Sequence, residues 1–181
     1  MRAAALSLAY ALLAIAAAPP AQRSIDTQRS KARFSVSHIW VERVTGTVPI
    51  AGGSVTIAPD SLIPIAASAQ FDAAKIETDE PDRDAALRSP DFFDTAKFPT
   101  WTFVSTKVTP KSAAAFEMDG DLTVHGVTQP ERLNVAASGD PAHPVYHATA
   151  TIDRHAFGMA VTRLDPTIGS TVEVTLDVTL K

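Results

Sequence analysis

The residue types that most often catalyse reactions or bind metals are spread along this sequence without forming a recognisable motif. Its five histidines, at positions 38, 125, 143, 147 and 155, fall in different predicted segments. An isolated histidine is more often a packed or solvated residue than a metal ligand. The chain has no cysteine, which excludes thiolate zinc sites, cysteine nucleophiles and disulfides. We therefore expect no metal site and no cofactor.

Charged side chains gather between residues 79 and 88, where they could do acid and base chemistry. The cluster contains Asp79, Glu80, Asp82, Arg83, Asp84 and Arg88. Asp84 and Arg88 have the spacing and order of an exposed ion pair on a helix, so we interpret the cluster as a solvated helix. Arg83 and Arg88 would also suit a clamp for a polar head group. Phe92 and Phe93, which follow, would lie near the entrance of a binding site.

The sequence predicts no catalytic residue, and we expect a protein that is not an enzyme. A secreted hydrolase with a dispersed Ser/His/Asp site stays open as an alternative, because such a site needs no sequence motif. The 16 basic and 20 acidic residues give a net charge of −4. This balance supplies no basic surface for a phosphate backbone, so we expect no nucleic-acid partner and favour a neutral or apolar ligand.

The first 21 residues have the pattern of a secretory signal peptide. Arg2 precedes an uncharged, alanine-rich run from Ala3 to Ala18, and small residues follow at candidate cleavage positions. The run is shorter than the roughly 20 residues that cross a bilayer, although an uncleaved anchor is the alternative. We expect cleavage to leave one domain over residues 22–181 without stable membrane insertion. Without a cysteine for a lipid anchor, it would be soluble and periplasmic or secreted.

Most of the remaining chain alternates apolar and polar residues, as half-buried β-strands do. The clearest alternation places apolar residues on one face of segments 65–71, 116–124, 146–152 and 172–180. Weaker strand candidates are Arg33 to Trp40, Val44 to Ile50, Gly53 to Ala58, Thr100 to Val108 and Arg132 to Ser138. Pro81 stands where the first turn of a helix tolerates proline, which predicts one short helix near residues 81–88.

These segments predict an all-β fold: an up-and-down antiparallel eight-stranded β-barrel, lipocalin-like in shape, with that one helix. The inward positions include several small residues: Ala67, Ala69, Gly120, Ala137, Ala148 and Ala150. Small lining residues favour a cavity over a barrel filled by its own side chains. A solid-cored barrel that acts through its surface is the alternative.

Four stretches together resemble one protein family. They are RSKARFSVSHIWVERVTG at 29–46, RDAALRSPDFFDTAKFP at 83–99, GDLTVHGVTQP at 120–130, and the ending FGM…IGSTVEVTLDV. Over essentially the whole predicted domain the chain resembles the YceI-like polyisoprenoid-binding family. The resemblance implies a periplasmic or secreted lipocalin-like barrel that carries or sequesters a long isoprenoid chain, without catalysis or metal. The family commonly has a histidine where this chain has Ala86, so a head-group role for an imidazole there does not transfer.

The predicted ligand is a long-chain isoprenoid, an isoprenoid quinone or another apolar lipid, whose affinity would come from apolar area removed from water. The predicted binding residues are Phe34, Val36, His38, Phe71, Arg83, Arg88, Phe92, Phe93, Trp101, Phe103, Met118, Leu122 and Tyr146. Tyr146 or His38 could supply one polar contact. A one-residue shift in strand phase would turn Thr102 and Val104 inward in place of Trp101 and Phe103. Whether two barrels pair as a homodimer is left open by the sequence.

Overall fold

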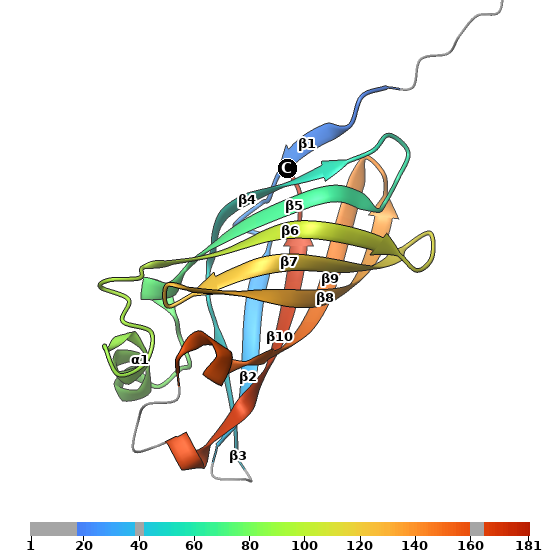
Figure 1. Ribbon diagram of the computed structural model, residues 1–181. Helices are drawn as coiled ribbons and strands as arrows, with labels where there is room; N and C mark the ends of the chain where they lie inside the picture. The colour runs from blue at the N-terminus through green and yellow to red at the C-terminus, as the bar shows by residue number, and fades with distance from the viewer. Residues whose placement is uncertain (1–17, 39–41, 160–164) are drawn as a thin grey trace, which may run out of the picture.

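The computed structural model describes residues 18–38, 42–159 and 165–181 (Figure 1). The predicted signal peptide over residues 1–21 lies almost wholly outside this part of the chain, as do Ile39 and Trp40 of one candidate strand. The described strands are β1 (Ala21–Ser24), β2 (Lys31–His38), β3 (Glu42–Thr47), β4 (Ile50–Ile57), β5 (Pro64–Asp72), β6 (Thr100–Pro110), β7 (Ala115–Val124), β8 (Val127–Asp140), β9 (His143–Asp153) and β10 (Ile168–Thr179). Helix α1 spans Pro81–Arg88, and short 3₁₀ helices span Ala73–Lys75, Arg154–Phe157 and Asp165–Thr167.

The described strands form one antiparallel sheet in the order β1-β4-β5-β6-β7-β8-β9-β10-β2-β3. The all-β prediction is confirmed, but the sheet has ten strands in the described residues, so the prediction of eight is wrong. One reason is the short β1, which pairs with β4 and lies within a segment without clear alternation. Among the described residues, no helix has the length and apolar character needed to cross a membrane.

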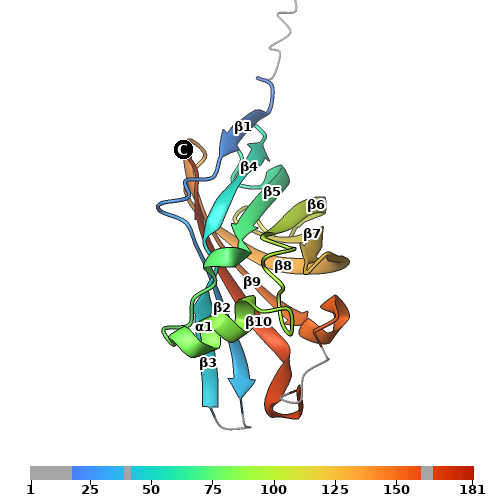
Figure 2. The same ribbon diagram turned by 90° about the vertical axis from the view of Figure 1, so that its left-hand side faces the viewer.

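A two-residue link makes the sheet curl strongly. Val48 and Pro49 alone separate β3, at one end of the sheet order, from β4, next to the other end. The Val48 N–H donates to Ala32 O of β2 at 3.1 Å, and Pro49 O accepts from the Asp72 N–H of β5 at 2.9 Å. Because a link of two residues spans only about 10 Å, it holds the two sides of the sheet together. The result is the half-barrel seen from two directions in Figures 1 and 2.

The predicted alternation is confirmed on most strands and wrong at one position. Trp101 and Phe103 face inward, while Val104 is 53% exposed, so β6 has the predicted phase. Ile65, predicted to face inward, is 54% exposed. Thr56 pairs with Ala66 while the next residue, Ile57, pairs with Pro64, which leaves Ile65 as an extra residue in β5. Such a bulge reverses the phase, and Pro64 is buried in its place.

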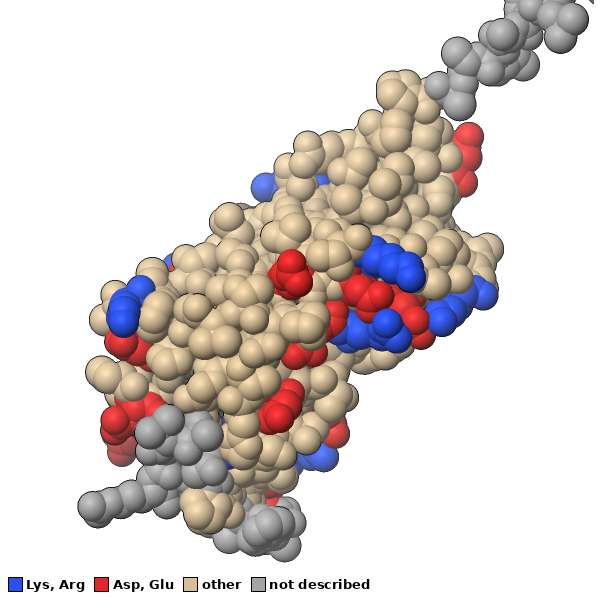
Figure 3. Space-filling model, viewed as in Figure 1, with Lys and Arg blue, Asp and Glu red and all other residues tan. Residues whose placement is uncertain are grey.

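The outer face of the sheet carries charged residues in pairs of opposite sign. Arg132 Nε of β8 lies 2.6 Å from Asp119 Oδ1 of β7, and Lys111 Nζ, between β6 and β7, lies 3.0 Å from Glu117 Oε1 of β7. Figure 3 shows acidic and basic side chains side by side on this face. The Arg132 hydrogen bond is the main reason that the pKa of Asp119 is lowered. The outward positions of these strands are thus solvated, which leaves their apolar positions to fill the interior.

One end of the interior is solid. Phe116, Met118 and Tyr146 are buried there, and the rings of Phe116 and Tyr146 pack edge-to-face with centroids 6.1 Å apart. Gly120 leaves room for a neighbouring ring, because an added Cβ would lie 2.3 Å from Phe103 Cζ. Gly120 therefore accommodates a large side chain and does not line a void. The argument from small residues to a cavity fails for Gly120, Ala137 and Ala148.

Tyr146 provides a test of this solid end. Burial raises the pKa of Tyr146 to about 12, and the hydroxyl has no hydrogen-bond partner among the described residues. Because Tyr146→Phe removes only an unpaired hydroxyl, we expect the free energy of unfolding to fall by less than about 1 kcal/mol, or to rise. Tyr146→Ala should cost about 3–5 kcal/mol, since it leaves a hole in a packed core. Equal losses in urea unfolding of the two variants would contradict this packing.

Candidate functional site

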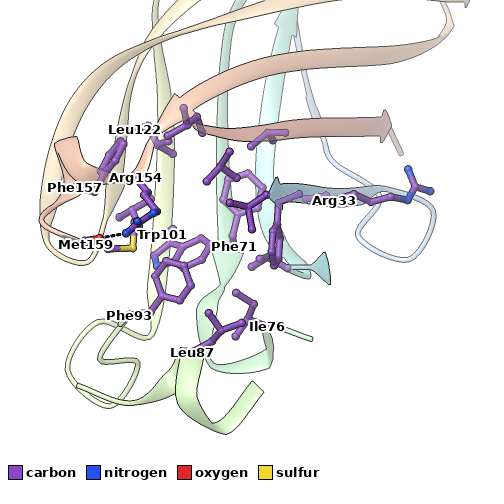
Figure 4. A pocket seen from close by; sticks show the side chains of 18 of the residues that line it. Arg33, Phe71, Ile76, Leu87, Phe93, Trp101, Leu122, Arg154, Phe157 and Met159 are labelled. Carbon is purple, nitrogen blue, oxygen red and sulfur yellow. Dashed lines mark hydrogen bonds between the residues drawn. The ribbon is translucent and has the colours of Figure 1, made fainter. Parts of the chain in front are cut away.

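The other end of the interior is hollow and forms a cavity of about 420 Å³. Its wall comes from the inner faces of β2, β3, β5 to β10, from α1 and from the segments that follow α1 and β9. In Figures 1 and 2, α1, which contributes to this wall, lies at the end of the half-barrel away from β1 and the C-terminus. Figure 4 shows aromatic and aliphatic side chains pointing into the space. The site is therefore a largely apolar pocket.

Ten of the thirteen predicted binding residues lie on the cavity wall. They are Phe34, Val36, His38, Phe71, Arg83, Phe92, Phe93, Trp101, Phe103 and Leu122. Met118 and Tyr146 have the predicted inward orientation but lie in the solid end. Alternation identifies the face of a strand but not how far along it the interior is filled. Contact of any of these residues with a ligand stays a prediction.

Arg88 is not on the wall, and its guanidinium is used within the fold. Its Nη2 donates to Ile76 O at 2.7 Å, while its Nε is buried without a hydrogen-bond partner among the described residues. Arg83 does reach the wall, but its Nε and Nη2 donate to Thr78 Oγ1 and Thr78 O, both at 2.8 Å. Both arginines thus fix α1 to the segment that precedes it. The geometry does not support the predicted clamp for a head group.

Asp84 is buried and does not form the predicted ion pair with Arg88. Its Oδ1 accepts from the Thr78 N–H at 2.8 Å and from Thr78 Oγ1 at 2.6 Å. The interpretation of this cluster as an exposed, self-paired helix is therefore wrong at Asp84, because the carboxylate binds buried donors of Thr78 and not Arg88. Helix α1 itself has the predicted bounds, Pro81–Arg88. Asp84, Arg83 and Thr78 therefore hold α1 against the cavity.

The role of Asp84 can be tested by substitution. Asp84→Ala would leave the Thr78 N–H and hydroxyl without their acceptor, so we expect a loss of about 1–3 kcal/mol in the free energy of unfolding. Asp82→Ala is a matched control in the same helical turn, because Asp82 is exposed and should cost less than about 1 kcal/mol. Chemical denaturation of both variants measures the difference. A loss that is as large for Asp82→Ala would show that the Thr78 network is unimportant.

The wall also contains residues that were not predicted. Arg154 is buried, and its Nε and Nη2 donate to Gly169 O and Ile168 O, both at 2.9 Å, while Nη1 donates to Met159 O. Phe157 and Met159 line the cavity beside it (Figure 4). Arg154 thus ties the 3₁₀ helix to the start of β10. No sequence pattern predicts this role, because the partners of Arg154 are backbone carbonyls.

Glu131 is an unpredicted carboxylate on the apolar wall. It lies two residues before Leu133, so the alternation of β8 would have placed it inward had the predicted strand begun earlier. Burial, with a smaller contribution from the charge of Asp153, raises the pKa of Glu131 above its ordinary value of 4.5. The ionised form is thus disfavoured in the folded protein.

This shift predicts a pH dependence. Folding favours protonated Glu131, so its contribution to stability is greatest below pH 4.5 and decreases as the pH rises through the raised pKa. Glu131→Gln should therefore be more stable than the wild type at pH 7, and this advantage should disappear well below pH 4.5. Thermal unfolding across this range measures it, with Asp121→Asn, at an exposed position of β7, as control. A lower stability of Glu131→Gln at pH 7 would contradict the prediction.

Trp101 brings an unused hydrogen-bond donor to the wall. Its ring packs on Phe93, with centroids 4.6 Å apart and planes at 55°. The indole Nε1 is buried and has no hydrogen-bond partner among the described residues. A buried N–H without an acceptor costs free energy, so an oxygen on a bound molecule would be a favourable partner. Trp101 can thus supply both an apolar surface and one polar contact.

The structure gives less support to two alternatives from the sequence, a hydrolase with a dispersed Ser/His/Asp site and a barrel with a solid core. His147 Nδ1 lies 2.8 Å from Asp177 Oδ1, but both side chains are solvent-accessible, and Arg33 also binds Asp177 on the polar face of the sheet. Hydrogen bonds from His147 and then Arg33 lower the pKa of Asp177. Within the described residues, His, Asp and Glu side chains do not gather into a group that could hold a metal. A barrel that is solid throughout is ruled out by the cavity.

Comparisons with known proteins agree with this architecture. Residues 24–180 match the model of the YceI-like domain. A UPF0312 protein of Pseudomonas putida is 32% identical over 166 residues, which cover 86% of this chain and 85% of that protein. The fold is similar to the YCEI protein of Campylobacter jejuni, with a TM-score of 0.72 and 21% identity over 80% of this chain and 89% of that one. It is also similar to a polyisoprenoid binding domain from Saccharophagus degradans, with a TM-score of 0.63 and 18% identity over 90% and 99% of the two chains.

Proposed function

The chain belongs to the YceI-like domain family, and we propose that it binds an isoprenoid or isoprenoid-quinone lipid in its cavity as a carrier or sequestering protein. The observation that carries the proposal is the cavity of about 420 Å³ with an almost wholly apolar wall. The Saccharophagus degradans domain of similar fold, described as a polyisoprenoid binding domain, supports the choice of ligand class. The protein acts by binding, without catalysis.

The wall suits a ligand that has few functional groups along its length. Such a chain gains affinity from the apolar area removed from water, at about 25 cal/mol per Å². Phe34 and Val36 on β2, with Phe71 on β5, supply such surface to the wall of the cavity. Specificity would then come from the few polar groups on the wall.

Trp101 favours a lipid that carries an oxygen. Its unpaired Nε1 would donate to a quinone carbonyl or an alcohol, whereas a pure hydrocarbon would leave it unpaired. Phe93 against the same ring would hold the indole in position. An isoprenoid quinone or alcohol therefore fits the wall better than a hydrocarbon alone.

The proposed place of action is supported by the N-terminal sequence. Arg2 and the apolar run after it have the pattern of a secretory signal peptide, and we propose that the mature protein is soluble in the periplasm or is secreted. There it would carry a lipid that is insoluble in water between membranes, or keep it apart from them. The cavity provides the apolar space that this requires.

The proposal is tested by identifying what the protein carries. The protein is purified from the periplasm without detergent and extracted with organic solvent, and the lipid is identified by mass spectrometry. We expect a prenyl lipid in nearly stoichiometric amount, and quenching of Trp101 fluorescence when a prenyl quinone is added to the lipid-free protein. Protein without lipid that also shows no response to added prenyl quinone would contradict the proposed function. A Trp101→Phe variant identifies which part of the quenching comes from the cavity.

A further inference from the structure

The basic side chains on the cavity wall have acceptors within the protein. In the described part of the wall these residues are Arg33, His38, Arg83 and Arg154. Arg33 Nη1 lies 2.5 Å from Asp177 Oδ2, and Figure 4 shows its guanidinium directed away from the labelled aromatic side chains. His38 Nδ1 lies 3.7 Å from Glu42 Oε2. Neither side chain is therefore left with its positive charge facing the cavity alone.

The two other arginines on the wall donate to groups of the fold. Arg83 Nε and Nη2 donate to Thr78, and the Arg154 guanidinium donates to the carbonyls of Met159, Ile168 and Gly169. These hydrogen bonds hold neighbouring segments together. An anionic head group in the cavity would thus meet no basic side chain of the described wall that lacks an acceptor of its own.

Glu131 has the opposite situation. It lies on the wall, and its carboxyl has neither a hydrogen bond nor an ion pair within the part of the chain that the structure describes. Its register partner on β7 is Gly120, against which the ring of Phe103 lies, and Leu133 continues the same wall along β8. The carboxyl is therefore an unpaired polar group on an apolar surface, and a hydrogen-bond donor on a ligand would satisfy it.

The sheet parts beside Glu131. Strands β8 and β9 are paired only between Asn134–Asp140 and His143–Thr149, and Glu131 lies on the part of β8 that is paired with β7 alone. Ile152 lies on the part of β9 that is paired with β10 alone, and it lines the cavity as Glu131 does. Figure 1 shows the two strands diverging toward this end. The cavity thus reaches the place where the strands separate, which gives a head group room beside the carboxyl.

The surroundings of Glu131 disfavour negative charge. Burial, with a smaller contribution from the charge of Asp153, raises the pKa of Glu131. A phosphate monoester carries a charge of about −1.5 to −2 at pH 7, and a charge in apolar surroundings is costly unless it is paired. A hydroxyl adds no charge and donates a hydrogen bond to the carboxyl. Trp101 Nε1 does not discriminate, because it can donate to an oxygen of either group.

From these contacts we infer that Glu131 selects the head group of the ligand. The cavity takes a lipid whose polar end is an uncharged hydrogen-bond donor, such as the hydroxyl of a prenol or a hydroquinone, and disfavours a phosphate on the same chain. The inference rests on the proposed function and adds the charge of the head group and the residue that recognises it.

The test compares geranylgeraniol, its methyl ether and its monophosphate, which share one hydrocarbon chain. Their affinities are measured at pH 7 by displacement of a fluorescent prenol from the purified protein. We expect the alcohol to bind about fivefold more tightly than the ether, which lacks the O–H donor, and at least about tenfold more tightly than the phosphate. The phosphate is also more soluble in water, so the change on substitution of Glu131 decides the matter.

Two substitutions separate the charge of Glu131 from its hydrogen bond. Glu131→Gln keeps an acceptor and removes the charge, so the alcohol should bind within about threefold of the wild type, while its advantage over the phosphate falls at least about fivefold. Glu131→Leu removes the acceptor, so the alcohol and the ether should bind equally. Asp121→Asn is the matched control, because Asp121 is exposed on β7 and pairs with Pro130, next to Glu131. It should keep the wild-type preferences.

The outcomes distinguish the two proposals. An unchanged preference against the phosphate in Glu131→Gln, or a preference for the alcohol over the ether that persists in Glu131→Leu, would overturn the role of Glu131 and leave the proposed function in place. Failure of the fluorescent prenol and of all three lipids to bind the wild type would overturn the proposed function, and the role of Glu131 with it.

Discussion

The two residues between β3 and β4 impose the constraint on which the other features depend. Val48 and Pro49 are hydrogen-bonded to β2 on one side and β5 on the other, so the sheet has to curl around an interior. Because the outer face is solvated by paired charges, the apolar position of every second residue turns inward. The curl therefore creates an apolar space whose size is set by the side chains that enter it.

That space is divided unequally. At one end, aromatic rings fill it, and Gly120 makes room for the ring of Phe103. At the other end, an apolar wall faces a void, and a void deprives its lining of packing contacts. The same residues would be better packed with an apolar chain between them. The solid end stabilises the fold, which allows the hollow end to remain available for a ligand.

The sequence predicted the elements better than the way in which they fill space. The short helix and the inward phase of Trp101 and Phe103 followed from local patterns, since each depends on neighbouring residues. Met118 shares that inward phase but lies in the solid end, because filling depends on side chains from distant strands. Asp84 was misjudged for the same reason: its partner, Thr78, lies outside the helix. The extra residue at Ile65 leaves no trace in the alternation.

The central claim is that a lipid chain fills the hollow end of the interior. A crystal structure of the protein bound to a prenyl quinone tests it most directly. The account predicts continuous density for the ligand against the apolar wall, with an oxygen of the ligand within hydrogen-bond distance of Trp101 Nε1. An empty cavity with the ligand bound elsewhere would contradict it.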